Sequence, residues 1–185
     1  MTQQKANSLA ALRVEMKVPA GFDVIAYTDG GCRGNPGVGG WGFLVINATT
    51  GAALERCGGE ADTTNNRMEF LAAIMALRAL RKPGTSVLLH SDSNLLIKSA
   101  SEWIPGWKSR GWKKKDGELK NVDLLKEIDA LMSQHRVRWQ WVKGHAGDPG
   151  NEYVDALTNR AMDALQRRAD PAFEKRSEWP LGRPR

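Results

Sequence analysis

The chain has little of several features that define whole classes of protein. It has two cysteines, Cys32 and Cys57, and they form no metal-type spacing. No apolar run reaches the length of a transmembrane helix, no secretory hydrophobic segment is visible near the N-terminus, and no segment repeats. These absences weigh against membrane and secreted proteins and predict a reduced, cytoplasmic setting.

A nucleotide-binding loop is also missing. Residues 37–42 match the pattern G-x-G-x-x-G, but they lead into an expected strand, so no helix N-terminus is available for a pyrophosphate. No Gly-Lys-Ser/Thr sequence follows, which excludes a P-loop. We expect these glycines to form a tight hairpin turn or to let a substrate backbone come close.

The composition that is present suits one globular domain with a sizeable core. The 185 residues are 41% hydrophobic and 26% charged, and the formal net charge is +6. Much of the excess lies within residues 108–120, where six cationic side chains stand against two acidic ones. Such a segment suggests a polyanionic partner, although surface lysines are more often only solvated.

The hydrophobic pattern predicts an α/β fold. Three strands that are close in sequence form an antiparallel meander, and a strand–helix–strand order implies a right-handed crossover to a parallel pair. We therefore expect a five-stranded mixed sheet, with three antiparallel and two further parallel strands and helices on both faces. The expected strands are 22–28, 41–46, 52–58, 86–90 and 136–142, and the expected helices are 65–80, 94–101, 121–132 and 149–165.

Composition changes at both ends of this pattern. A Pro-Ala-Gly break at 19–21 precedes the first strand, and beyond Leu165 the chain turns to Arg, Lys and Pro. We expect a flexible N-terminal extension over 1–20, one domain over 21–165, and a flexible basic tail over 166–185. Within the domain, the basic segment at about 103–120 is expected to form a protrusion.

Four acidic residues fall at comparable places in the expected fold. Asp29 and Asp92 each follow a buried strand, while Glu69 and Asp155 each lie early in a helix. If the two strands are parallel neighbours, their ends lie side by side, and helix starts can deliver the other two carboxylates to that edge. The negative charges of such a cluster repel one another, and a bound divalent metal ion usually offsets this repulsion.

Three of these acids have an alternative interpretation. Asp92 fits the cap of the helix that follows it, and Glu69, three residues after Asn66, fits a capping box. Asp155 fits an exposed helical residue. Only Asp29, within an apolar strand end, lacks such an explanation, and the combination of all four carries the metal hypothesis.

Four sequence runs together resemble those of bacterial ribonuclease H, type 1, in order and spacing. They are YTDGGCRGNPG at 27–37, TTNNRME at 63–69, SDS at 91–93 and WVKGHAG at 141–147. The similarity covers roughly 22–165. It implies an endonuclease that cuts the RNA strand of an RNA–DNA hybrid and leaves 5′-phosphate and 3′-hydroxyl ends.

The resemblance also implies a role for individual residues. It makes Asp29, Glu69, Asp92 and Asp155 the ligands of two Mg²⁺ ions, with Mn²⁺ as the other candidate, and His145 a loop residue that helps proton transfer or product release. It implies contacts with the hybrid, including the 2′-hydroxyls that mark RNA, from a further set of residues, which are Cys32, Asn35, Thr64, Asn65, Asn66, Asn94 and Asn151.

The basic segment resembles the family's protrusion that grips the DNA strand. Its cations would neutralise phosphates, and its tryptophans would anchor the protrusion to the rest of the domain or pack on sugars. The residues concerned are Trp103, Trp107, Lys108, Arg110, Lys113, Lys114 and Lys115. The alternative is that Trp103 and Trp107 only fasten this loop to the body of the protein.

Two departures from the family pattern and two rival functions stay open. Asn94 stands where a glutamine is common, and Asp148 lies near the expected site, where it fits the N-cap of the last helix ahead of Pro149. The rivals are a hybrid-binding module without catalysis and another nuclease or recombinase with this fold. Nothing in the sequence suggests an apolar stripe for a dimer, so we expect a monomer.

Overall fold

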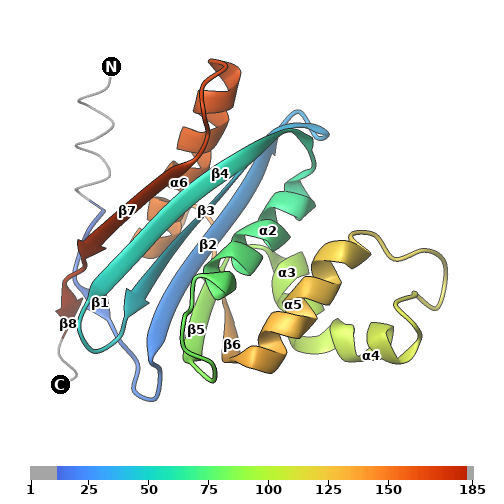
Figure 1. The fold of residues 1–185 in the computed structure, drawn as a ribbon, viewed down its shortest axis with the longest axis horizontal. Helices are drawn as coiled ribbons and strands as arrows, with labels where there is room; N and C mark the ends of the chain where they lie inside the picture. The colour runs from blue at the N-terminus through green and yellow to red at the C-terminus, as the bar shows by residue number, and fades with distance from the viewer. Residues whose placement is uncertain (1–11, 183–185) are drawn as a thin grey trace.

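The computed structural model describes residues 12–182 of the 185-residue chain. Its centre is a six-stranded mixed sheet in the order β6-β5-β2-β3-β4-β7 (Figure 1). β2, β3, β4 and β7 are antiparallel to their neighbours, whereas β5 and β6 continue the sheet from β2 as parallel strands. The strands are β2 Val24–Arg33, β3 Gly37–Asn47, β4 Ala52–Thr63, β5 Ser86–Ser91, β6 Arg136–Trp141 and β7 Phe173–Glu178.

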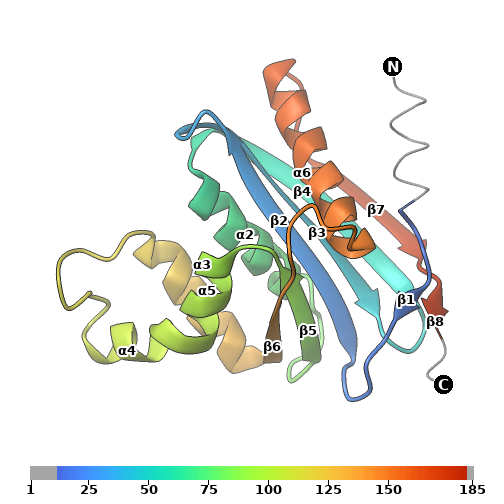
Figure 2. The same cartoon turned by 180° about the vertical axis from the view of Figure 1, so that it is seen from behind.

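Helices cover both faces of the sheet, as predicted. α2 (Asn65–Arg78) and α5 (Val122–Gln134) lie on one face, and α6 (Pro149–Gln166) lies on the other (Figures 1 and 2). Between β5 and α5 the chain forms α3 (Asn94–Lys98), a π-helical turn η1 (Ser99–Trp103) and α4 (Ile104–Ser109). Each face of the sheet has its own cluster of buried apolar side chains. No helix within 12–182 is long and apolar enough to cross a membrane.

Helix α2 lies in the middle of the fold because its sequence is apolar on nearly every side. Its small residues Ala72, Ala73 and Ala76 are fully buried, which lets the helix lie close against the sheet. The Thr64 side chain caps its start by accepting a hydrogen bond from the Arg67 backbone N–H at 3.3 Å.

Residues 37–42 form the start of β3 instead of the tight hairpin turn that was one of the two expectations. A Cβ added at Gly39 would lie 2.8 Å from Met68 Cγ of α2, and one added at Gly42 would lie 2.9 Å from Leu157 Cβ of α6. Glycine is therefore required because a helix approaches the sheet on each face. This explains the G-x-G-x-x-G pattern without any nucleotide.

Both termini of the described chain also differ from the expectation. Residues 173–178, which we expected within a flexible tail, form β7 and pair with β4 along its first half, so the sheet has six strands instead of five. The short strands β1 (Met16–Lys17) and β8 (Leu181–Gly182) pair with each other. Trp179 anchors this region, since it is 3% exposed and its Nε1 donates to the Val14 carbonyl at 2.9 Å. The predictions for residues 1–11 and 183–185 lie outside the described residues.

Candidate active site

Three carboxylates converge where the parallel pairing of β2 with β5 ends. One oxygen each from Asp29, Glu69 and Asp92 lies within 4.8 Å of the others. β2 and β5 are parallel neighbours, and Tyr27 pairs with His90. Asp29 lies two residues after Tyr27, and Asp92 lies two residues after His90, so the two acids are level with each other. The prediction that Asp29 and Asp92 lie side by side on parallel neighbours is therefore confirmed, although Asp29 lies within β2, which continues to Arg33.

Helix α2 supplies the third carboxylate because it touches β2 at a glycine. A Cβ at Gly30 would lie 2.2 Å from the Met68 carbonyl carbon and 2.3 Å from the Glu69 backbone nitrogen. Only glycine allows this approach, and it brings Glu69 next to Asp29. The backbone of Gly30 favours the charged form of both carboxyl groups and so partly opposes the rise of their pKa values.

The capping explanations do not hold for two of the acids. The N-cap of α3 is Ser93, whose side chain accepts from the Leu96 N–H at 3.2 Å, so Asp92 is not the cap. The N-cap of α2 is Thr64, which leaves Glu69 outside any capping box. Asp148 does cap α6 by accepting from the Asn151 N–H at 2.9 Å, with Pro149 as the first helical residue.

The cluster is electrostatically unfavourable in the metal-free protein. Burial, followed by repulsion from Asp92 and Asp155, raises the pKa of Asp29 to about 8. Burial and repulsion from Asp29 and Asp92 raise the pKa of Glu69 well above its ordinary value. The two side chains are only 7% and 6% exposed.

These donors fit a hard divalent cation. Oxygen ligands from clustered carboxylates are the set that Mg²⁺ and Mn²⁺ prefer. Glu69 Oε2 is buried and has no hydrogen-bond partner within residues 12–182, so it has a free coordination position. A bound cation would satisfy this oxygen and remove the mutual repulsion that raises the pKa values.

Asp155 and His145 border the cluster. Asp155 lies half-buried on α6 and does not belong to the set of converging oxygens. Its pKa is raised by burial and by Asp92 and Glu152, while His145 acts in the opposite direction. His145 itself is exposed in the loop between β6 and α6, in a left-handed backbone conformation with φ of 53°.

The residues expected to contact a substrate fall into two groups around this site. In the first, Asn35 Oδ1 accepts from the Asn65 N–H at 3.2 Å and Cys32 Sγ donates to the Thr63 carbonyl at 3.3 Å, so the β2–β3 turn is joined to the start of α2. Thr64 is committed to its cap, whereas Asn66 is exposed.

The second group lies beside Asp92. Asn94 is exposed on the first turn of α3. Asn151 is buried, and its Nδ2 makes a long contact of 3.5 Å with Asp92 Oδ2. Asn151 is therefore placed to orient a member of the carboxylate cluster.

The basic segment projects beyond α5, on the side of the molecule away from β7 (Figure 1). Trp107 is only 9% exposed and packs in the core, so it supports the segment from beneath, whereas Trp103 is 38% exposed. Lys108 Nζ makes an ion pair with Asp129 at 2.9 Å, and Arg110 Nε donates to the Lys113 carbonyl at 3.4 Å. The exposed lysines of the following loop are Lys113, Lys114 and Lys115.

Sequence reasoning missed two supporting residues. Arg67 joins α2 to α5 through two hydrogen bonds to the Asp123 carboxylate, at 3.1 and 2.9 Å. Its place within the TTNNRME run was the available signal. Trp141, at the end of β6, donates its indole N–H to the Asp92 carbonyl at 3.2 Å, and nothing in the alternation of β6 indicated this bond.

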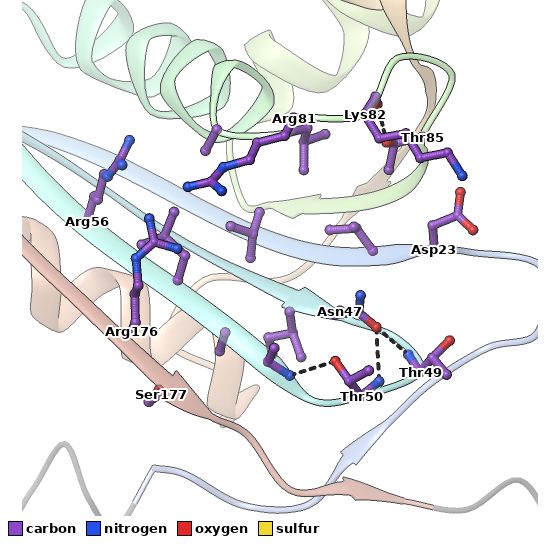
Figure 3. A pocket seen from close by; sticks show the side chains of 18 residues that line it. Asp23, Asn47, Thr49, Thr50, Arg56, Arg81, Lys82, Thr85, Arg176 and Ser177 are labelled. Atoms are coloured by element: carbon purple, nitrogen blue, oxygen red, sulfur yellow. Dashed lines mark hydrogen bonds between the residues drawn. The ribbon is translucent and has the colours of Figure 1, made fainter.

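A pocket in the described part of the chain lies apart from the acidic cluster. It has a volume of about 600 Å³ and lies at the opposite end of the sheet, between the start of β2 and the end of α2 (Figure 3). Asp23 and four cationic side chains, Arg56, Arg81, Lys82 and Arg176, are among its lining residues. None of the predicted site residues lines it.

A mixed sheet that gathers three carboxylates where the pairing of two parallel strands ends, in a chain that also carries an exposed basic segment, defines a nuclease with a ribonuclease H-like fold. The chain belongs to the ribonuclease H family of endoribonucleases, whose family model, described as RNase H, matches residues 22–163. The chain is 53% identical over 141 residues to the ribonuclease H of Cupriavidus pinatubonensis, an alignment that covers 76% of this chain and 95% of the relative.

Further relatives support the same assignment. Identity to the ribonuclease HI of Pseudomonas aeruginosa is 51% over 140 residues, covering 75% of this chain and 93% of the relative. Among solved structures, LC9-RNase H1, a type 1 enzyme with the type 2 active-site motif, has a TM-score of 0.70 and 33% identity, covering 79% of this chain and 75% of that one. LC11-RNase H1, solved in complex with RNA/DNA hybrid, has a TM-score of 0.58 and 25% identity, covering 77% and 99%.

Proposed function

We propose that this chain hydrolyses the RNA strand of RNA–DNA hybrids with two divalent cations, Mg²⁺ or alternatively Mn²⁺, and leaves 5′-phosphate and 3′-hydroxyl ends. The observation that carries the proposal is the convergence of Asp29, Glu69 and Asp92 within 4.8 Å in a ribonuclease H chain. The hybrid complex of the similar LC11-RNase H1 supports the choice of substrate.

The carboxylates hold the catalytic centre. Bound divalent cations would lower the pKa of a water molecule for in-line attack and offset the negative charge on the leaving 3′ oxygen. Asp29, Glu69 and Asp92 would bind them, with Asp155 as a fourth ligand reached from α6. Because burial raises the pKa of Asp29 to about 8, cation binding must displace protons from the cluster near neutral pH.

His145 is the candidate for moving protons near the site. It lies on an exposed loop, and its lowering effect on the pKa of Asp155 supports a position near this acid of α6. From there it would transfer a proton between the reacting groups and solvent, or help the product to leave. Its exposure supports a loop that can move toward the substrate.

Substrate recognition is assigned to the two groups of residues around the cluster and to the basic segment. Asn35, Asn66 and Asn94 are exposed and offer amide groups to the groove of a hybrid, where 2′-hydroxyls distinguish RNA from DNA. Lys113, Lys114 and Lys115 would neutralise phosphates of the DNA strand.

We also propose a monomer in the cytoplasm. Within residues 12–182 the exposed large hydrophobic side chains are Val14, Trp103 and Trp141, each on a different element or loop, which supports a protein without an apolar dimer interface. Cys32 and Cys57 are both free thiols, as a reducing compartment would keep them.

A cleavage assay with a panel of substrates tests this proposal. Labelled RNA–DNA hybrid, double-stranded RNA and double-stranded DNA are incubated with the protein in Mg²⁺ or in EDTA. We expect cleavage of the RNA strand of the hybrid in Mg²⁺ alone. Binding of hybrid without cleavage would favour the binding-module alternative. Cleavage of duplex DNA would favour another nuclease of this fold. Undiminished cleavage in EDTA would show that the reaction does not need a metal ion.

A further inference from the structure

Trp141 is an exposed tryptophan in direct contact with the acidic cluster. It ends β6 and is 43% exposed, although a large aromatic side chain is usually mostly buried. Its Nε1 donates a hydrogen bond to the main-chain carbonyl of Asp92 at 3.2 Å. This bond gives a reason for an indole at this place.

The carbonyl of Asp92 needs such a partner because of its place in the chain. Asp92 lies between the last residue of β5 and Ser93, the N-cap of α3, so its carbonyl precedes the helical hydrogen-bond ladder. The residues on either side are already fixed. The Ser91 carbonyl accepts from the Val142 N–H at 3.0 Å, and the Ser93 N–H donates to Ser91 Oγ at 3.1 Å. Trp141 therefore gives the Asp92–Ser93 peptide group its second hydrogen bond, at the carbonyl, while Ser91 Oγ holds the N–H of the same group.

The loop after Trp141 contacts the other end of the same residue. A Cβ added at Gly144 would lie 2.8 Å from Asp92 Oδ2, so the loop backbone packs directly against this carboxylate. Asp92 is thus held at its main chain by Trp141 and at its carboxylate by the loop. Both restraints come from the end of β6, and neither comes from the β5–α3 segment that carries Asp92.

We infer that Trp141 is a positioning residue for the Asp92 arm of the metal site, and that its indole N–H raises the affinity of the site for divalent cations. The inference rests on the metal site proposed above. Groups that orient a metal ligand typically change metal affinity by about 10–100-fold when they are removed. Without the indole N–H, the Asp92–Ser93 peptide group keeps only its bond to Ser91 Oγ, so its carbonyl end is held less firmly and the Asp92 carboxylate can shift away from Asp29 and Glu69.

The neighbouring Trp139 provides a matched control. It lies two residues earlier on β6, and its Nε1 is buried without a hydrogen-bond partner in the described part of the chain. Trp141→Phe and Trp139→Phe therefore remove the same group from the same strand, and only the first removes a bond to Asp92. Mn²⁺ is titrated calorimetrically into the metal-free, full-length protein without nucleic acid. We expect about tenfold weaker binding for Trp141→Phe and unchanged binding for Trp139→Phe.

Asp29→Asn, titrated in parallel, separates this inference from the proposed function. If Asp29→Asn loses Mn²⁺ binding while Trp141→Phe binds as the wild type does, the positioning role is wrong and the metal site stands. If Asp29→Asn binds as the wild type does, the metal site itself is wrong. A rise in KM for hybrid at unchanged Mn²⁺ affinity in Trp141→Phe would make Trp141 a nucleic-acid contact and would also overturn the inference.

A measurement on the unaltered protein keeps the test independent of how the variants fold. In the wild-type chain with isotope-labelled tryptophan, Mg²⁺ should shift the NMR resonance of the Trp141 indole N–H, because this group is bonded to a ligand residue. The Trp139 resonance should not shift. A chemical shift of the Trp141 indole N–H that does not change on addition of Mg²⁺ would contradict the positioning role.

Discussion

At the scale of single residues, Asp29 gives the strongest support for the proposed metal site. Its side chain is 7% exposed, and burial together with its acidic neighbours raises its pKa to about 8. A structural aspartate would be paired with a cation or lie in solvent. An acid that is costly in the metal-free protein and useful only when a cation binds is typical of a functional site.

The raised pKa predicts how stability depends on pH. Between the unfolded pKa of 3.8 and the folded pKa of about 8, the native state binds more protons than the unfolded state, so the free energy of unfolding falls as pH rises. Above about pH 7 the half-buried His90 and the buried His135, whose pKa values burial lowers, are mostly neutral in both states and oppose the trend only weakly.

Urea unfolding of the metal-free protein between about pH 7 and pH 9 measures this effect. We expect the free energy of unfolding to fall with pH in the wild type, and Asp29→Asn to be more stable than the wild type by roughly 1–3 kcal/mol at pH 9. Saturating Mg²⁺ should remove the difference by stabilising the wild type. A wild-type stability that is flat or rises over this range would contradict the electrostatic account.

At the scale of elements, the site depends on how closely α2 lies against β2. Gly30→Ala would place a methyl group 2.2 Å from the Met68 carbonyl carbon, so the helix that carries Glu69 must move. We expect a loss of about 1–3 kcal/mol in the free energy of unfolding and weaker Mg²⁺ binding. Thermal unfolding and calorimetric titration measure the two effects.

The adjacent glycine supplies the control for that variant. A Cβ at Gly31 would lie 3.6 Å from Met162 Cε, an ordinary van der Waals distance, so Gly31→Ala should keep both stability and Mg²⁺ affinity. If Gly30→Ala behaves like Gly31→Ala, close approach of α2 is not what assembles the cluster.

The order and type of the main elements could be predicted from the sequence, but their extent in the glycine-rich region could not. Hydrophobic periodicity predicted the meander, the crossover and α2. We expected a turn after Thr28, whereas β2 runs to Arg33 and β3 begins at Gly37. Glycines resemble turn residues in a sequence, and only the three-dimensional packing shows that helices lie over them.

β7 was missed for a related reason. Its sequence FEKRSE is mostly charged and exposed, so no apolar alternation indicates a strand. It forms because β4 offers an unpaired edge and Trp179 anchors the segment that follows. For the site, the three converging carboxylates could be predicted because the strand ends and one helix carry them. The bond from Trp141 to Asp92 could not, because it joins a side chain to a distant carbonyl.

At the scale of the whole molecule, acidic and basic groups are kept apart. The carboxylates cluster where the pairing of β2 with β5 ends, while the exposed lysines of the basic segment lie beyond α5 (Figure 1). The carboxylates repel the phosphates of a nucleic acid. We therefore expect the lysines to hold some phosphates at the basic segment, and cations at the acidic site to neutralise the others.

Removing these charges predicts a change in salt dependence. Replacing Lys113, Lys114 and Lys115 by Ala should raise KM for hybrid and reduce the slope of log binding constant against log salt concentration by up to about 3, since each phosphate contact contributes about 0.9. Binding measured over a range of salt concentrations provides the slope.

Three exposed cations elsewhere provide the matched control. Lys17, Arg81 and Lys82 are exposed and do not belong to the basic segment, and the last two line the pocket at the opposite end of the sheet. Their replacement by Ala changes the net charge equally. An equal loss of slope in both triple variants would show a general charge effect and would refute a specific role of the protrusion.

The central claim is that the carboxylates clustered where the pairing of β2 with β5 ends hold the cations needed to cleave the RNA strand. Single-turnover cleavage of a labelled hybrid by Asp29→Asn in Mg²⁺, with hybrid binding measured on the same protein, tests it most directly. We predict that the cleavage rate falls by at least about a thousandfold while the affinity for hybrid stays within a few-fold of the wild type. The reason is that the substitution removes an interaction that stabilises the transition state and leaves the contacts that bind the hybrid in place. Cleavage at the wild-type rate would contradict the account.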